Sequence, residues 1–196
     1  MKLDIPFYRQ GKNECGQTSL QMIFEFLGKK IDKDEITSKV DPEHSGATYT
    51  VGLARAAAEF GFRVEFYSKY LEINPENYEL DFYKKETSGF EISERKLNKI
   101  IEDCKRLGVK LEEKSFELDE LLGRVGKGVI VLINWNVIVG KEGYQGHFVP
   151  IVGYDSENVY FHNADSEDGM NYCVKREIFD MARKSKGTDE DFLVIG

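Results

Sequence analysis

The strongest constraint on the fold is a continuous apolar run at residues 129–135, in the C-terminal third of the chain. Its short length and its β-branched residues predict a strand that is buried on both faces. Further strands are predicted at 147–154, 159–162, 171–174 and 191–195. A sheet whose central strand is apolar on both faces needs a cover on each face, and the rest of the chain must supply it.

The first half of the chain is mostly helical in its periodicity. Apolar residues at helical spacing predict an amphipathic helix that ends at Gly28; they are Leu20, Ile23, Phe24 and Leu27. Other helices are predicted at about 32–40, 50–60, 97–104, 119–125 and 175–184, and short strands at 3–8, 62–67 and 109–112. Helices that precede strands predict an α+β fold, with N-terminal helices packed on a C-terminal antiparallel sheet.

Length and charge narrow the classes of protein further. A chain of 196 residues predicts a single domain over 1–196, with an irregular excursion or lid at about 68–90, where no period is evident. A net charge of −8 argues against nucleic acid or an anionic membrane as the main partner. The N-terminus has no apolar signal core, which predicts a cytoplasmic protein. Three scattered cysteines predict neither a disulfide framework nor a zinc site, and no cofactor is expected.

Cys15 stands where the first amphipathic helix is predicted to begin. The unpaired N–H groups and the positive dipole end of a helix favour thiolate over thiol, so Cys15 is a candidate nucleophile. Gly16 would let a substrate carbonyl approach the backbone closely. The alternative is that Cys15 packs in the core, as most free cysteines do.

His147 follows a glycine and opens an apolar strand, which indicates the rim of a sheet. Imidazole is the usual base for a thiol nucleophile, so His147 is the candidate general base, although a rim histidine can be purely structural. A turn near residues 156–157 places His147 opposite about residue 166, give or take three. Asn163 and Asp165 both fall in that range, and either could orient the imidazole ring.

Gln10 lies five residues before Cys15. Its amide could join the Cys15 backbone N–H as a donor to an oxyanion, while Gln17 is predicted to point away from the attacked carbonyl. Asp165 belongs to an acidic stretch, 165–168, which could instead be solvated or bind a hard cation weakly.

These candidates stand in two blocks of sequence. The first is Gln10 with Asn13-Glu14-Cys15-Gly16-Gln17-Thr18-Ser19-Leu20-Gln21-Met22. The second is Gly146-His147-Phe148-Val149-Pro150-Ile151-Val152-Gly153-Tyr154-Asp155, followed by Val159-Tyr160-Phe161-His162-Asn163. Together they resemble the bacteriocin-processing (double-glycine leader) cysteine peptidase family and its stand-alone papain-like relatives. The resemblance spans about residues 5–28 and 129–165 and leaves the middle of the chain uncovered.

The resemblance implies a papain-like fold and a cysteine peptidase mechanism. In that pattern Cys15 would be the nucleophile, His147 the general base and acid, Asn163 the orienting residue and Gln10 the oxyanion donor, with Asp165 as the alternative triad member. The chain departs from the pattern in having Asn163-Ala164 where the family usually has Asp-Pro. No membrane or nucleotide-binding segment accompanies these blocks, so the leader-peptide substrates of the transporter form are not implied.

We therefore expect a hydrolase that cleaves amide bonds of a peptide or protein substrate through a thioester. The alternatives are acyl transfer to an amine on the same scaffold and a catalytically silent module that binds peptides. Cys104, on an apolar helix face, and Cys173, in a strand, are predicted to be structural. Trp135 is predicted either to fill the core or to form a wall of the cleft beside His147.

Overall fold

The structure, a computed structural model, describes residues 2–196. Its helices are α1 (Cys15–Phe26), α2 (Lys33–Val40), α3 (Thr50–Glu59), η1 (Pro75–Glu79, a 3-10 helix), α4 (Asp81–Glu86), α5 (Phe90–Arg106), α6 (Leu118–Leu122), α7 (Trp135–Ile138) and α8 (Arg176–Arg183). Its strands are β1 (Val64–Ser68), β2 (Lys110–Glu113), β3 (Gly128–Asn134), β4 (Gly146–Tyr154), β5 (Asn158–Phe161), β6 (Tyr172–Lys175) and β7 (Phe192–Ile195).

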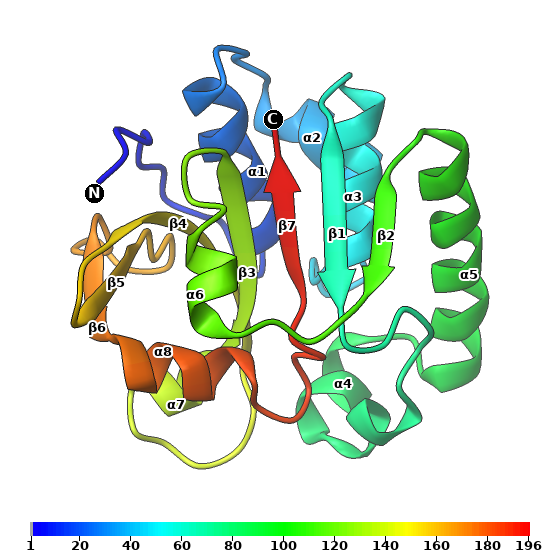
Figure 1. Cartoon of the computed structure of the whole chain (residues 1–196). Helices are drawn as coiled ribbons and strands as arrows, with labels where there is room; N and C mark the ends of the chain where they lie inside the picture. Colours follow the sequence, from blue (N-terminus) through cyan, green and yellow to red (C-terminus); the bar gives the residue numbers. More distant parts are fainter. Residues whose placement is uncertain (1) are drawn as a thin grey trace.

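The strands form one sheet in the order β2-β1-β7-β3-β4-β5-β6 (Figure 1). β1 and β2 run parallel, and the other neighbours are antiparallel. The predicted α+β class is confirmed. The most C-terminal strand, β7, lies in the middle of the sheet and joins β1 on one side to β3 on the other.

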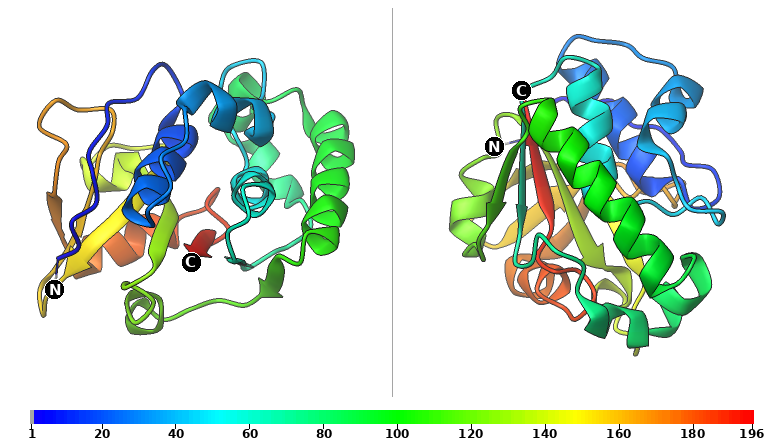
Figure 2. Two further views of the ribbon diagram at one scale, coloured as in Figure 1. Left: turned by 90° about the horizontal axis from the view of Figure 1, so that it is seen from above. Right: turned by 90° about the vertical axis from the view of Figure 1, so that its right-hand side faces the viewer.

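Helices cover both faces of this sheet, as its apolar central strand requires. α1, α2, α3 and α5 lie on one face, and α6 and α8 lie on the other (Figure 2). Every residue of β3 is buried. Ile130 and Leu132 pack toward the first set of helices, while Val129, Val131 and Ile133 pack toward the second. Each such side chain contributes about 1.5–3 kcal/mol by leaving water, so this strand holds the two layers together.

Two predictions of local structure were wrong. Residues 3–8 are not a strand: the Leu3 N–H donates to the Val152 carbonyl, and the described N-terminal segment is joined to the sheet by one bridge, Lys2 to Gly153. The excursion predicted as irregular contains η1 and α4. Asn74 caps η1 by accepting from the Glu76 N–H at 3.1 Å. Helices of five or six residues are too short to show a period, which explains the error.

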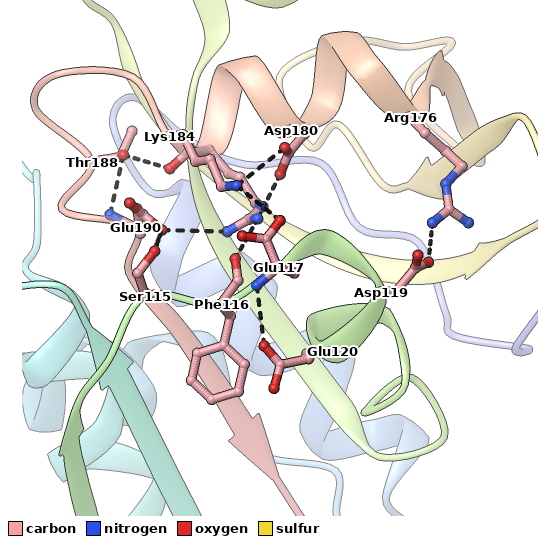
Figure 3. A network of polar contacts seen from close by, with 11 residues as sticks. Ser115, Phe116, Glu117, Asp119, Glu120, Arg176, Asp180, Lys184, Thr188 and Glu190 are labelled. Carbon is pink, nitrogen blue, oxygen red and sulfur yellow. Dashed lines mark hydrogen bonds and ion pairs between the residues drawn. The ribbon is translucent and has the colours of Figure 1, made fainter.

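A buried arginine fixes the turn that leads into β7. Arg183, at the end of α8, is 1% exposed and donates to the Phe116 carbonyl at 2.6 Å. It also pairs with Asp180 at 2.5 Å and with Glu190 at 3.7 Å. Thr188 donates to the Arg183 carbonyl at 2.6 Å. Figure 3 shows this network, which ties the chain before α6 to α8 and to the 188–191 turn.

None of the helices within residues 2–196 is both long enough and apolar enough to cross a membrane.

Candidate active site

The five site residues predicted from the sequence all line one cavity of about 490 Å³. They are Cys15, His147, Asn163, Gln10 and Asp165. The cavity lies where β3 ends and β4 begins, and the start of α1, the η1–α4 segment and the turn before β7 complete its wall. Its volume is within the range of about 300–1,000 Å³ typical of small-molecule and substrate sites.

Cys15 is the first residue of α1, as predicted. The preceding turn is held by Glu14, whose carboxylate accepts from the Gly11 N–H at 3.0 Å and pairs with Lys33 at 2.5 Å. Gly16 serves packing, because a Cβ there would lie 2.7 Å from the Thr48 methyl group. The glycine is therefore required for close contact with the segment before α3, which the sequence alone did not indicate.

Burial controls the ionisation of Cys15. It raises the pKa of the thiol, while the backbone N–H groups of Phe148, Gly16 and Cys15 itself lower it by less. Negative charge on Asp165 adds to the increase in pKa. The N–H groups expected at a helix N-terminus thus act on the sulfur, but the expected net shift toward thiolate was wrong, because the effect of burial on the pKa is larger than theirs.

His147 lies at the start of β4 and is 7% exposed. Its Nε2 lies 3.0 Å from the Asn163 side-chain oxygen. Since that oxygen can only accept, Nε2 carries the hydrogen in the neutral ring and Nδ1 is left as the acceptor. Burial lowers the pKa of His147 to about 4, against smaller opposing effects of Asn163 and Asp165. Trp135 packs edge-on against the imidazole at 5.5 Å between ring centroids and forms part of the cavity wall.

Asn163, rather than Asp165, is the residue bonded to the imidazole. The β4–β5 hairpin pairs Tyr154 with Val159, as the predicted turn requires. The register then shifts by one residue between Ile151 and Gly153. After β5 the chain leaves the sheet, and the Asn163 N–H donates to the Gly169 carbonyl at 2.8 Å. This turn directs the amide of Asn163 back toward His147.

Asp165 bonds to Gln10 instead. The Gln10 Nε2 donates to the Asp165 carboxylate at 3.3 Å, and the Gln10 backbone N–H donates to the Ala164 carbonyl at 3.0 Å. The Asp165 N–H in turn donates to the Asn163 side-chain oxygen at 3.2 Å. The segment before α1 and the loop after β5 are thereby joined beside the Cys15 thiol, which places the Gln10 amide at the cavity wall.

The other two cysteines differ from Cys15 in their surroundings. Cys104 is buried in α5 and its sulfur lies 3.6 Å from the Val51 carbonyl, which agrees with a structural role. Burial raises its pKa to about 12. Cys173 is exposed on the edge strand β6 rather than packed. Reagents that modify thiols will therefore reach Cys173 directly, so labelling of Cys15 must be measured in a variant that lacks the Cys173 thiol.

Part of the cavity wall was not predicted from the sequence. It comes from two tyrosines, two asparagines and two aspartates: Tyr83, Tyr144, Asn74, Asn77, Asp189 and Asp191. Three of them, Asn74, Asn77 and Tyr83, lie in the stretch at about 68–90 that the sequence predicted only as an irregular excursion or lid. The run Asp189-Glu190-Asp191 is visible in the sequence. An acidic run is usually a solvated surface, and nothing in the sequence distinguishes this run from such a surface.

Comparison with known proteins gives two kinds of match. A family model described as guanylylate cyclase matches residues 5–195. The curated protein named Guanylyl cyclase 1, from Arabidopsis thaliana, is 23% identical over 212 aligned positions, which cover 98% of this chain and 76% of that protein.

Solved structures with the same fold are peptidase domains. A C39-like peptidase from Bacillus anthracis has a TM-score of 0.63 at 15% identity and covers 100% of this chain and 98% of that one. The peptidase domain of Streptococcus ComA has a TM-score of 0.55 at 10% identity, and the match covers 98% of this chain and 97% of that domain. A third structure is a double-glycine motif protease from an AMS/PCAT transporter in complex with the leader peptide. It has a TM-score of 0.54 at 16% identity, and the match covers 99% of this chain and 92% of that protease. At these identities the likeness establishes the papain-like C39 fold.

Proposed function

This chain belongs to the guanylylate cyclase family by sequence, and from the fold that it shares with C39 peptidase domains we propose that it is a thiol-dependent hydrolase of amide bonds in peptides. Cys15 is the nucleophile and His147 the general base. The supporting observation is that both residues line one cavity, while Asn163 bonds to Nε2 of the imidazole and leaves Nδ1 free of that bond. This is the arrangement of nucleophile, base and orienting residue that thiol hydrolases need.

The resting pair consists of a neutral thiol and a neutral imidazole, since burial disfavours each charge. Transfer of the proton from the Cys15 sulfur to His147 Nδ1 creates a thiolate and an imidazolium together. The attraction between these two opposite charges compensates for part of the cost of forming them in a buried site. Asn163 stabilises the imidazolium, because its side-chain oxygen accepts from Nε2 in both states.

The thiolate then attacks the carbonyl carbon of the substrate, forming a C–S bond and an oxyanion. Collapse of this intermediate breaks the C–N bond, and His147 gives its proton to the leaving amine. Water, deprotonated by His147, hydrolyses the thioester and returns the thiol. The Gln10 amide and the Cys15 N–H are the donors to the oxyanion, and Gln10 Nε2 has a second N–H besides the one that it donates to Asp165.

The test is cleavage of a mixture of peptides, followed by mass spectrometry, with Cys15→Ala and His147→Ala as inactive variants. Cys173→Ser is the matched control, because it removes an exposed thiol that does not line the cavity. New peptide termini that depend on Cys15 support hydrolysis, and amide products with an added amine would indicate acyl transfer. Activity that persists in Cys15→Ala would contradict the mechanism. Binding of peptides without turnover would identify the silent module.

The family description and the name of the Arabidopsis relative favour a second candidate, guanylyl cyclase activity. The cavity suits it poorly. Six carboxylates line it, Glu43, Glu72, Glu86, Asp165, Asp189 and Asp191, against one lysine, Lys12. Phosphate groups need arginine, lysine or helix N-termini to compensate their negative charge, and here the start of α1 and Lys12 would have to outweigh the six acidic side chains. Incubation with GTP and Mg²⁺ or Mn²⁺ tests this candidate: cyclic GMP formed at equal rates by the native protein and Cys15→Ala would favour it over the hydrolase.

A further inference from the structure

The end of the cavity formed by η1 and the turn before β7 consists of hydrogen-bond acceptors. Asp189 is held there by two amides, since Asn74 Nδ2 donates to its Oδ1 at 2.9 Å and Asn77 Nδ2 donates to its Oδ2 at 2.6 Å. Both asparagines and both Asp189 and Asp191 line the cavity. The Asn74 side-chain oxygen is used to cap η1, whereas the Asn77 side-chain oxygen has no partner.

Two of these oxygens are buried without a hydrogen bond. One is Oδ1 of Asn77, a residue that is only 3% exposed, and the other is Oδ1 of Asp191. The hydroxyls of Ser68 and Thr50 lie close enough to Asp191 to lower its pKa, but neither makes a well-formed hydrogen bond to that oxygen. Buried acceptors are almost always paired in folded proteins. The Thr50 hydroxyl, which is also buried without a partner, is one donor available to Asp191, so the Asn77 oxygen is the acceptor that most clearly lacks a donor.

The acceptor end and the Cys15 end belong to the same cavity. Tyr144 connects them: burial raises the pKa of its hydroxyl, and Asp191, Asp189 and Cys15 all add to that increase. Tyr83 and Tyr144 stack with 5.8 Å between ring centroids and form a flat apolar wall beside the passage. A long, mostly aliphatic side chain with a terminal cation matches a passage of this kind.

The charges of the cavity favour a cation as well. Six carboxylates face one lysine in its lining, and Lys69 acts on Asp189 from outside that lining. We propose that Asp189, Asp191 and Asn77 form a subsite for the protonated amine or guanidinium of a lysine or arginine side chain of the substrate. A cation there would supply N–H donors to both unpaired oxygens, and its positive charge would favour loss of the Asp191 proton, so that Asp189 and Asp191 balance it. This inference rests on the proposed hydrolase, and it adds a substrate class.

The experiment uses two peptidyl chloromethyl ketones that differ in one side chain, lysine or its uncharged counterpart norleucine. Alkylation of Cys15 is followed by mass spectrometry in the Cys173→Ser protein, and each rate is divided by the rate with iodoacetamide. We expect the lysine probe to react faster by about 10- to 100-fold, the range of a charged hydrogen bond. Asp191→Asn, which keeps the shape of the side chain, should reduce that ratio at least tenfold.

A matched control is Asp34→Asn with Glu35→Gln, which removes two exposed charges on α2 and should keep the preference. Thermal unfolding of each variant shows whether it is folded. If chloromethyl ketones label Cys15 and the two probes react equally, the subsite is wrong and the hydrolase stands. If no electrophile labels Cys15, the hydrolase itself fails. If CaCl2 or MgCl2 stabilises the native protein but not Asp191→Asn and abolishes the lysine preference, the site holds a metal ion and the inference is overturned.

Discussion

The buried carboxyl of Asp191 makes a prediction about how stability depends on pH. Burial raises its pKa from 3.8 to about 8, the like charge of Asp189 adds to this, and the hydroxyls of Ser68 and Thr50 oppose it. In the folded protein the group therefore keeps its proton up to about pH 8, whereas in the unfolded chain it loses the proton near pH 4. Folding then becomes less favourable as the pH rises between these two values, and the full loss is present above about pH 8.

The magnitude follows from the width of that interval. Each pH unit inside it costs about 1.4 kcal/mol, so raising the pH from 5 to 8 should lower the free energy of unfolding by about 4 kcal/mol through this group alone. Asp191→Asn has no proton to lose. The unfolding free energy of the variant minus that of the native protein should therefore rise by about 3–5 kcal/mol from pH 5 to pH 8. A constant cost of the new amide does not change this rise.

The assay is urea unfolding of both proteins at pH 5, 6, 7 and 8, at constant ionic strength. The measured quantity is the difference in unfolding free energy between variant and native protein at each pH. Burial raises the pKa of Tyr83 and of Tyr144, so both hydroxyls stay neutral over this range and do not enter the difference. Parallel profiles, with a difference that stays constant within about 1 kcal/mol, would show that the carboxyl is not buried as described.

Three further predictions concern the site and its support. Asn163→Ala should lower kcat by about 10- to 100-fold with little change in KM, while Asp165→Asn should change kcat less than threefold, and an equal loss in both would contradict the assigned orienting residue. Iodoacetamide labelling of Cys15 in Cys173→Ser should keep rising above about pH 8.5, because burial raises the pKa of the thiol; a plateau between pH 5 and 8 would indicate a resting thiolate. Gly16→Ala should destabilise the protein by about 1–3 kcal/mol in thermal unfolding, since the new methyl meets the Thr48 side chain, and an unchanged Tm would show that the contact can relax.

The sequence predicted best those features that depend on local pattern. The apolar run of β3 and the turn between β4 and β5 were both read from neighbouring residues, and the observed pairing of Tyr154 with Val159 agrees with that prediction. The choice between Asn163 and Asp165 could not be made in this way. It depends on a register shift in the hairpin and on how the loop after β5 turns, and neither can be predicted from the spacing of residues.

The ionisation of Cys15 and the acceptor end of the cavity show a second limit. A position at a helix N-terminus is a local property, but burial of the thiol depends on β4 and on segments far along the chain. Asn77 and Asp189 are 112 residues apart in sequence, and their meeting follows from the placement of β7 and η1. Tertiary placement of this kind is invisible to periodicity.

The position of β7 has a consequence for how the chain is made. Before residues 192–195 leave the ribosome, β1 with β2 and β3 with β4–β6 are two separate groups of strands with unpaired inner edges. The pairing of Val64 with Ile195 also links two distant parts of the sequence, which slows folding. The turn just before that strand, with Asp189 and Asp191, completes the wall of the cavity, so the cavity can form only after residues 2–191 have been translated and β7 has joined the two groups of strands.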